Sequence, residues 1–529
     1  MDTSIRAAPP GALGALIRCR VGIVPAVLLV LAILKASDAT SSGPIDADYG
    51  WHIAMGLQML ASGAIATVDN LTWTFTGQPY IATQWLGQVI LAIFYRAGGE
   101  QGTLLLLVLV AAAGTLIATR TAQLHVKNAT LSLLVSGFTS AFLWGLFARP
   151  QILGMLAFTV TVYLVELWRV RADRRALALL PLVGVIWVNL HGSFLLGLAY
   201  IALVTFADAG PSLFDKRIGE ALRIALPLVL AGAAFALATL VNPYAVGAWT
   251  NVIEIAGYRS TQSGVISEWA ATSLSHDLGQ AFVGFLVMLV AVWLSSRRKP
   301  TLPEGFAYVA IVLFSMLAFR NAYFGLLALT PALSRGLHDS PVRDVLTSRL
   351  PQKVPLALAT LALVAAVAAH PLIWDATHQT EQKILQHEYP VKAVAFMQRH
   401  AIQGRIYNES PVGGWITHTT GWPVFIDGRL DLFKDKFFFD WFDSWKGSPV
   451  WSSVFAKWKP EVVLVHSDAA IRQVLLAAGW TLAYEDADFS VVLPREDWCR
   501  DAIAHFERAP SATSNSDHAT QNGTAAMLE

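Results

Sequence analysis

The chain has 529 residues, of which 55% are hydrophobic and only 14% charged, with a formal net charge of +1 and a mean hydropathy of +0.50. Soluble proteins carry about 25% charged residues, so this composition excludes an ordinary soluble protein and indicates a polytopic α-helical membrane protein. The balanced charge gives no reason to expect a nucleic-acid partner. The two cysteines, Cys19 and Cys499, fall in segments predicted on opposite sides of the membrane, so we expect no internal disulfide.

The N-terminus carries basic residues followed by a short apolar run from Val21 to Leu34, which resembles a signal peptide. Lys35 and a polar stretch follow without a sharp cleavage site of small residues. This favours an uncleaved signal anchor over a cleaved signal, and both leave the same topology.

Eleven segments are apolar and long enough to cross the hydrocarbon core, which takes about 20 mostly apolar residues. They are roughly 21–36, 102–119, 130–148, 151–168, 176–191, 193–208, 222–241, 278–295, 303–319, 321–337 and 354–373. If Arg18 and Arg20 lie in the cytoplasm, every basic cluster among the spans lies there too, as the positive-inside rule requires. A further span at Trp85–Arg96 would move the cluster Arg169–Arg175 outside, so we expect Thr83–Tyr95 to lie at the outer interface.

This topology divides the chain into three regions. Residues 1–374 form the transmembrane domain, with long outer loops at 37–101 and 242–277. Residues 375–506 have the composition of an extracytoplasmic α/β domain, and the tail 507–529 is poor in large apolar residues and is expected to be disordered.

Within residues 375–506, short apolar runs alternate with segments of helical periodicity. The expected strands are Arg405–Asn408, Val424–Asp427, Glu461–His466 and Phe489–Leu493, and the expected helices are Lys392–His400, Ser452–Lys457 and Ala469–Ala478. This alternation predicts a small, mostly parallel sheet.

An acidic and aromatic segment, Asp46-Ala-Asp48-Tyr49-Gly-Trp51-His52, opens the first outer loop. Ionisable residues near a membrane are costly unless they are used, so this segment is the first candidate for a functional site.

Several motifs spread over most of the chain resemble those of the GT-C superfamily of membrane glycosyltransferases, in particular a bacterial branch of it. They are Asp46-Ala-Asp-Tyr-Gly-Trp-His52, Gln84-Trp85-Leu86, Arg149-Pro150-Gln151, Trp187-Val-Asn-Leu-His-Gly192, Val241-Asn-Pro-Tyr244, Glu268-Trp269 and Phe425-Ile-Asp-Gly-Arg429. The resemblance implies an enzyme of the bacterial inner (plasma) membrane, with a cytoplasmic N-terminus, that takes a sugar from a polyprenyl-phosphate carrier at the outer face. The first loop has Gly77-Gln-Pro-Tyr-Ile-Ala-Thr-Gln-Trp85 where many such enzymes carry a Lys-Pro-Pro run, so the identities of donor and acceptor do not carry over.

Transfer of a sugar to a hydroxyl group requires a base that accepts the acceptor's proton. Asp48 corresponds best to the superfamily's first-loop acid, with Asp46 beside it, and Glu268 in the second outer loop is a further candidate. Neighbouring carboxylates raise each other's pKa, which suits a base working near neutral pH. The alternative for one aspartate is capping of a helix that begins near Tyr49.

The departing lipid phosphate requires positive charge and hydrogen-bond donors. Arg149, His191 and Arg320 lie at predicted outer ends of spans, and Asn321 is adjacent, so these four are the candidate phosphate ligands. The alternative for the arginines is snorkelling at the membrane interface.

Four further residues are candidate substrate contacts: His52 and Trp51 in the first loop, and Tyr258 and Arg259 in the second. A structural role for His52 and a place in the interfacial aromatic belt for Trp51 are the competing interpretations. The motif Asp427-Gly-Arg429-Leu-Asp431 follows a predicted strand, where ligands often bind α/β sheets. The favoured interpretation is instead an ion pair of Asp427 and Arg429 that holds the outer domain against the membrane part.

The sequence therefore predicts an inverting membrane glycosyltransferase that uses a polyprenyl-phosphate-linked sugar and a lipid, glycan or protein acceptor. The first alternative is a lipid-linked glycan transporter or flippase, which would be expected to carry charged groups near the membrane midplane, whereas the span centres here carry few charges. The second alternative is an O-antigen ligase or polymerase, which would usually carry its large outer segment between spans, whereas this chain has that segment at the C-terminus. No cofactor is expected; a divalent cation at Asp46 and Asp48 is compatible with two carboxylates, but no other feature of the sequence indicates one.

Overall fold

The computed structural model describes residues 46–140, 143, 148–258, 265, 267–274, 277–349 and 388–494. The predicted spans 21–36 and 354–373, both cysteines and the tail 507–529 lie outside these residues. The chain forms two compact units, one made of Met1–Tyr389 and Asn408–Phe442 and the other of Pro390–Tyr407 and Asp443–Glu529. The first unit thus includes part of the stretch that the sequence analysis assigns to the C-terminal domain.

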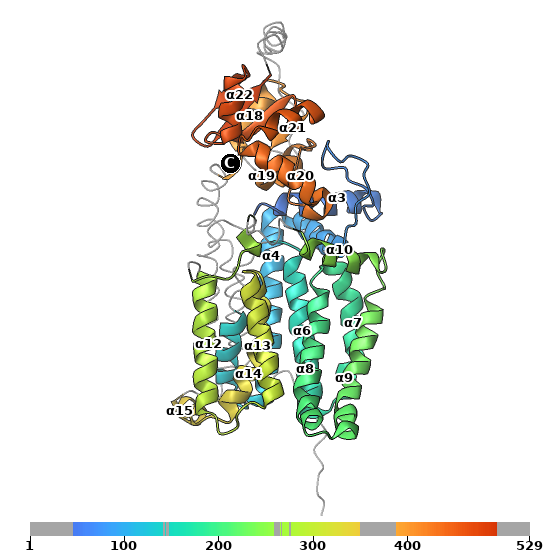
Figure 1. Ribbon diagram of the computed structural model, residues 1–529, viewed down its shortest axis with the longest axis vertical. Helices are drawn as coiled ribbons and strands as arrows, with labels where there is room; N and C mark the ends of the chain where they lie inside the picture. Colours follow the sequence, from blue (N-terminus) through green and yellow to red (C-terminus); the bar gives the residue numbers. More distant parts are fainter. Residues whose placement is uncertain are drawn as a thin grey trace, which may run out of the picture. The chain divides into compact units, whose positions relative to one another are not determined.

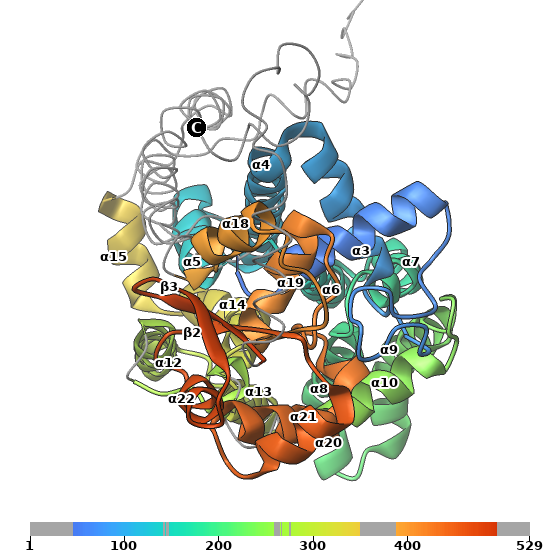
Figure 2. The same ribbon diagram turned by 90° about the horizontal axis from the view of Figure 1, so that it is seen from above.

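Long helices make up most of the first unit. They are α4 (Trp85–His125), α5 (Ala129–Ser140), α6 (Gln151–Arg171), α7 (Arg174–Leu190), α8 (Phe194–Phe214), α9 (Ile218–Ala238), α12 (Asp277–Ser295), α13 (Leu302–Leu317) and α14 (Asn321–His338). Figure 1 shows α6, α8, α9, α12, α13 and α14 side by side, and Figure 2 views them end-on. Each of these helices overlaps one of the predicted spans between residues 102 and 337, and α5 covers only the first part of the span predicted at 130–148.

Five helical segments in the described part of the chain are long and apolar enough to cross a membrane. They are Trp85–His125, Gln151–Arg171, Phe194–Phe214, Ile218–Ala238 and Leu278–Ser295, and the shorter apolar helices are Leu131–Ser140 and Leu302–Leu317. The chain is a multi-pass membrane protein.

A break at Gly98 and Gly99 divides α4 into two helical parts. Gly99 has φ 57° and ψ −141°, a conformation that favours glycine because it has no Cβ. The first part, which begins at Trp85, is therefore a segment distinct from the long apolar part, as expected for Thr83–Tyr95.

Shorter helices connect and flank the bundle. They are α3 (Tyr49–Ser62), α10 (Gly247–Ala256), the 3-10 turn η2 (Ser267–Trp269), α15 (Pro341–Arg349), α19 (Ser410–Thr420) and α20 (Leu430–Trp445). α3 begins at the residue where the sequence predicts a helix start and ends at Gly63, which has φ 65°.

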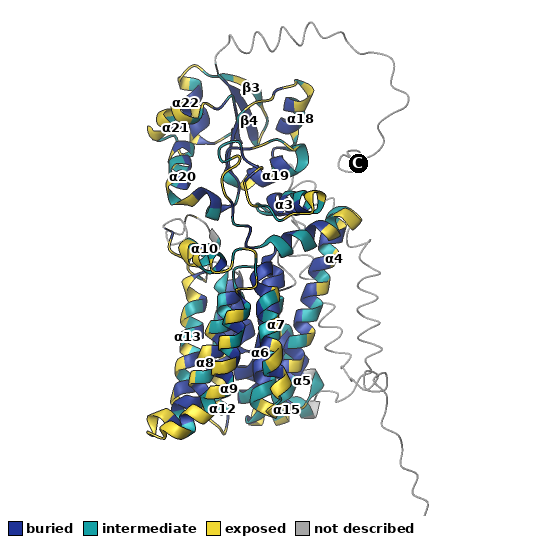
Figure 3. Ribbon diagram, turned by 90° about the vertical axis from the view of Figure 1, so that its right-hand side faces the viewer, coloured by how far each residue is buried: buried dark blue, intermediate teal, exposed yellow. Residues whose placement is uncertain are grey.

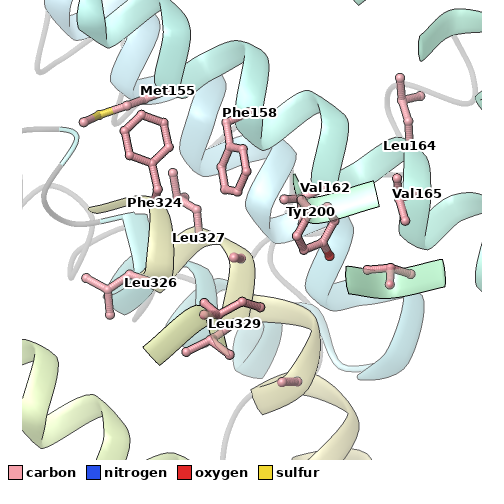
Figure 4. Close-up of a cluster of buried hydrophobic side chains, with 14 of the residues drawn as sticks. Met155, Phe158, Val162, Leu164, Val165, Tyr200, Phe324, Leu326, Leu327 and Leu329 are labelled. Atoms are coloured by element: carbon pink, nitrogen blue, oxygen red, sulfur yellow. The ribbon is translucent and has the colours of Figure 1, made fainter. Parts of the chain in front are cut away.

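The core of the bundle lies around α6 and α14. Phe158 of α6 makes edge contacts with Trp187, Tyr200 and Phe324, at ring-centre distances of 6.0, 5.8 and 5.3 Å, and Figure 4 shows these helices contributing to one apolar cluster. By contrast, α8 and α9 expose much of their apolar surface (yellow in Figure 3), as expected for helices that face lipid.

The helix α19 packs closely against α3. A Cβ atom added at Gly50 would lie 2.3 Å from the carbonyl oxygen of Gly414, so the two backbones meet where neither residue has a side chain. This contact carries the 408–442 segment onto the start of the first outer loop.

The prediction of a strand at Val424–Asp427 is wrong. Val424 forms an isolated parallel bridge with Thr72, and its backbone bonds go to Leu71 and Trp73 of the first loop. The apolar run is buried as expected, but its hydrogen-bond partners belong to a loop of the membrane unit and to the side chain of Asn408, which accepts from the Phe425 backbone N–H at 2.8 Å.

The second unit contains a four-stranded sheet in the order β1-β2-β4-β3, flanked in sequence by short helices. Its elements are α18 (Val391–Arg399), β1 (Ile406–Asn408, whose last residue belongs to the first unit), α21 (Val450–Trp458), β2 (Val462–His466), α22 (Ala470–Ala477), β3 (Thr481–Glu485) and β4 (Phe489–Leu493).

The expectation of a mostly parallel sheet is wrong, because β4 pairs antiparallel with both β2 and β3. β3 was not predicted, and it is joined to β4 by a tight turn. In that turn the Asp486 carboxylate accepts the backbone N–H groups of Asp488 and Phe489, at 2.9 and 2.7 Å. Such an Asx turn needs few residues, whereas a parallel connection needs a long crossover.

Candidate functional site

Asp46 and Asp48 lie at the start of α3 with different roles. One Asp46 oxygen accepts the backbone N–H groups of Asp48 and Tyr49, at 3.2 and 3.0 Å, so Asp46 caps the helix. Asp48 occupies the N-cap position but makes no capping bond with its side chain. Its Oδ1 instead accepts the indole N–H of Trp51 at 2.9 Å. The capping alternative therefore applies to Asp46.

Arg149, just before α6, holds three carboxylates from distant parts of the chain. It pairs with Asp46, with Asp48 at 2.9 Å and with Glu268 of η2 at 2.8 Å. The guanidinium presents five donors in a plane, which allows one arginine to orient several carboxylates. All three predicted acids thus meet at one residue.

The three carboxylates differ in accessibility. The Asp46 side chain is 7% exposed, Asp48 23% and Glu268 33%. Asp48 and Glu268 are therefore the members of the cluster that a bound molecule could reach, while Asp46 lies behind them.

The pKa of Asp46 differs from that of an ordinary surface carboxylic acid. Burial, together with the negative charges of Asp48 and Glu268, raises the pKa of Asp46 to about 6, although Arg149 opposes the shift. Burial acts to lower the pKa of Arg149, but the three carboxylates outweigh it and hold that pKa above its ordinary value.

Arg320 lies beside this cluster as a cation without a carboxylate partner among the described residues. Its guanidinium carbon lies 4.7 Å from the centre of the Trp269 ring, and its Nη2 donates to the Gln151 side-chain oxygen at 3.4 Å. Burial lowers the pKa of Arg320, and Glu268 acts in the opposite direction. The backbone N–H of Arg320 also donates to the Glu268 carbonyl at 3.3 Å, which fixes η2 against the start of α14.

His52 and Trp51 are part of the support of the site. Their rings are tilted against each other at 3.6 Å, and His52 Nδ1 lies 3.2 Å from the Gln88 side-chain nitrogen. His52 is buried, and burial together with the positive charges of Arg149 and Arg429 lowers its pKa. A neutral, hydrogen-bonded His52 fits the structural interpretation.

The other predicted residues make their hydrogen bonds outside the carboxylate cluster. His191 Nδ1 accepts the Ser193 backbone N–H at 3.1 Å. Asn321 donates to the Phe314 carbonyl at 3.1 Å, between α13 and α14. Tyr258 donates to Glu254 at 3.0 Å. Arg259 lies outside the described residues.

Gly428 is a site residue that the sequence analysis did not select. A Cβ atom at this position would stand 1.8 Å from Asp48 Oδ1 and 2.9 Å from the Trp51 indole nitrogen. The backbone of the 408–442 segment therefore lies directly against the Asp48 carboxylate, the candidate base, and only glycine fits at position 428.

Arg429, next to Gly428, is fully buried between two buried carboxylates. Its side chain contacts Asp69 of the first loop at 2.7 Å and Asp427 at 2.7 Å, and all three side chains are 0% exposed. The pair predicted from sequence is thus one part of a triad that ties the 408–442 segment to the first loop, with Tyr80 below the guanidinium at 5.3 Å.

No group of three or more His, Cys, Asp or Glu residues in the described segments is arranged to hold a metal ion. The carboxylates of the site converge on Arg149 instead.

No protein-family model matches the chain, and its sequence matches no curated protein. Solved structures do match. The apo oligosaccharyltransferase of Archaeoglobus fulgidus aligns with a TM-score of 0.50 and 11% identity over 84% of this chain and 69% of its own. ArnT from Cupriavidus metallidurans bound to undecaprenyl phosphate aligns with a TM-score of 0.48 and 16% identity, over 89% and 98%.

A third similar structure is archaeal AglB from Archaeoglobus fulgidus with an inhibitory peptide and a dolichol-phosphate, with a TM-score of 0.49 and 13% identity over 90% of this chain and 74% of its own. The alignment with the apo oligosaccharyltransferase shows that this chain shares the fold of that protein, in agreement with the general fold that the sequence motifs predict. The count of eleven spans and the C-terminal α/β domain stay predictions.

Proposed function

We propose that this protein is a membrane glycosyltransferase that moves a sugar from a polyprenyl-phosphate carrier to an acceptor at the outer face of the bacterial plasma membrane. The observation that carries the proposal is the cluster of three carboxylates on Arg149 beside Arg320, a cation that none of those carboxylates neutralises directly. A base and a phosphate-binding cation are what this reaction requires. The fold shared with an oligosaccharyltransferase supports sugar transfer as the reaction.

In the proposed reaction Asp48 takes the proton from the acceptor hydroxyl. The hydroxyl oxygen attacks the anomeric carbon, the bond between that carbon and the phosphate oxygen breaks, and the electron pair leaves with the polyprenyl phosphate. Attack opposite the leaving group inverts the anomeric configuration. Asp48 suits the role because one of its oxygens is fixed by Trp51 and the other by Arg149, while part of the carboxylate stays accessible.

Arg320 is proposed to bind the donor phosphate and stabilise its charge as it departs. Its weak contact with Gln151 leaves donors for phosphate oxygens, and stacking on Trp269 orients the guanidinium plane. Arg149, also predicted as a phosphate ligand, is assigned the different task of orienting the three carboxylates. His191 and Asn321 are secondary candidates, and Asn321 directly follows Arg320 in the chain.

The membrane topology is proposed to have eleven spans, with the N-terminus inside and the residues after 375 outside. The helices between residues 102 and 337 supply nine of these spans, and the basic clusters Arg169–Arg175 and Arg297–Lys299 lie at the ends opposite to Arg149 and Arg320. The positive-inside rule then directs the candidate site outward.

The test uses the full-length protein in lipid nanodiscs with polyprenyl-phosphate-linked sugars, and measures both donor binding and release of polyprenyl phosphate. Asp48→Asn keeps the side-chain size but cannot accept a proton, so we expect it to bind donor and fail to transfer. Arg320→Ala removes a charge-assisted contact of about 1.5–3 kcal/mol, and should weaken donor binding roughly 10- to 150-fold.

Asp215→Asn, at the exposed end of α8, is the matched control for an Asp→Asn change and should behave like the wild type. Transfer at the wild-type rate by Asp48→Asn would remove the proposed base and leave Asp46 or Glu268 to be tested. Transfer by a variant carrying both Asp46→Asn and Asp48→Asn would end the first-loop mechanism. Movement of intact donor across the membrane without release of polyprenyl phosphate would favour a flippase instead.

A further inference from the structure

A cavity lies at the opposite end of the helix bundle from the candidate site. It has a volume of about 640 Å³, and residues from α4, α6, α8, α9, α12, α13 and α14 line it. Arg149 and Gln151 precede or begin α6, whereas Arg169 is near its last residue, so about 30 Å of helix separates the two sites. The proposed sugar transfer uses none of the residues in this cavity.

The acidic and basic residues of the cavity are partly paired with one another. Arg169 binds Glu166 and Asp208, at 2.9 Å from Nε to the Asp208 Oδ2 atom. Arg335 binds Glu304 at 2.8 Å. These two arginines therefore have their carboxylate partners and form the fixed wall of the cavity.

Two other lining arginines, Arg223 and Arg298, have exposed side chains that form no ion pair in the described segments. In two further lining residues, the indole nitrogen of Trp293 and the Nε of Arg335 are buried without a hydrogen-bond acceptor. All of these groups are hydrogen-bond donors. Among the acidic residues that line the cavity, Asp339 forms no ion pair with another described residue. A ligand rich in acceptor oxygens and negatively charged, such as a phosphate group, satisfies this set of donors.

An apolar groove lies next to the charged cavity. It lies between α8 and α9, has a volume of about 490 Å³, and shares Leu228 with the cavity. Ile201, Phe206, Leu213 and Val229 are among its lining residues, and Thr205 is its one side chain with a polar group. A charged cavity beside an apolar groove on a lipid-facing surface matches a molecule with a charged head and a long apolar chain.

We infer that this end of the bundle binds an anionic phospholipid, with its phosphate-bearing head group in the cavity at Arg223 and Arg298 and an acyl chain in the groove between α8 and α9. Basic pockets between membrane helices on the cytoplasmic side are known to hold such head groups. The groove favours a phospholipid over a soluble phosphate, because a soluble ligand leaves the apolar groove unfilled.

The experiment measures lipid binding to the full-length protein in detergent by native mass spectrometry, together with Tm. The probes are phosphatidylglycerol, phosphatidylcholine with the same acyl chains, and glycerol 3-phosphate. Phosphatidylglycerol is expected to bind at least about tenfold more tightly than phosphatidylcholine, a difference of about 1.4 kcal/mol, and to raise Tm. Glycerol 3-phosphate is expected to do neither at the same concentration.

Three variants locate the site. The double change Arg223→Gln and Arg298→Gln should abolish the preference for phosphatidylglycerol, and folding is checked by an unchanged Tm without added lipid. Ala202→Phe should fill the groove and weaken binding of both phospholipids. Arg120→Gln changes an exposed α4 arginine that does not line the cavity; it is the control for loss of a surface arginine and should bind like the wild type.

Equal binding of the two phospholipids, or an unchanged preference in the double variant, would refute the head-group assignment. A rise in Tm with glycerol 3-phosphate as large as that with phosphatidylglycerol would show a soluble phosphate ligand and would overturn the phospholipid assignment. Displacement of phosphatidylglycerol by an equal amount of polyprenyl phosphate would reassign the site to the carrier.

Discussion

Replacement of Arg429 by alanine tests the buried triad with Asp69 and Asp427. The change leaves two carboxylates with 0% exposed side chains facing each other without their cation. Removal of one partner from a buried ion pair costs about 3–5 kcal/mol, because the remaining charge stays buried and uncompensated. With two carboxylates left, we expect a loss at the upper end of this range and a fall of several degrees in Tm.

The assay compares Tm of Arg429→Ala with that of Lys436→Ala, both in the full-length protein. Lys436 pairs with Asp440 one turn away on α20, and its side chain is 89% exposed. A pair of this kind contributes about 0.3–0.5 kcal/mol, so the control should melt close to the wild type. Equal Tm values for the two variants would refute the assignment of a buried triad.

A third variant separates charge from packing. Arg429→Met combined with Asp69→Asn and Asp427→Asn removes all three charges while keeping similar volumes, so it should recover much of the stability lost in Arg429→Ala. Turnover per folded molecule should change less than Tm, since these side chains hold the 408–442 segment and are not proposed to touch substrate. A well-folded Arg429→Ala protein without activity would show instead that the triad takes part in the reaction.

Three further predictions concern the site and the topology. The pKa of Asp46 is raised from 3.8 to about 6 in the folded protein. Between these two values the folded state holds a proton that the unfolded state has lost, so stability falls as the pH rises from about 4 to 6. Asp46→Asn should flatten this part of the Tm–pH profile, and an unchanged slope would contradict the assignment. Gly428→Ala places a Cβ 1.8 Å from Asp48 Oδ1, so transfer should be lost in a protein that still folds. The control is a glycine-to-alanine change at a position with no close neighbours, and equal activity of the two variants would disprove the close approach. In a chain without its native cysteines, a membrane-impermeant thiol reagent should label a cysteine at exposed Val246 and not one at Arg174; labelling at Arg174 from outside would reverse the proposed topology.

The sequence by itself determined the membrane class and the approximate positions of the long helices between residues 102 and 337. Twenty-residue apolar runs leave few alternatives, because a lipid-embedded backbone must satisfy its hydrogen bonds within a helix. The separation of Thr83–Tyr95 from the long apolar helix was expected from the distribution of basic residues, and the structure shows its local cause in the two consecutive glycines Gly98 and Gly99. The same local logic predicted the start of α3 at Tyr49.

Tertiary structure alone decided which residues share a site. Asp46, Asp48 and Glu268 were candidates separately, but nothing in their spacing shows that Arg149 joins all three, because the helices between them determine which loops meet. The partner of the run at Val424 was likewise not predictable: the pattern indicates an extended buried segment, while the backbone that pairs with it lies in the first loop at Thr72. Local sequence determines how each segment folds, and the packing of helices distant in sequence decides which charges come within a few ångströms of one another.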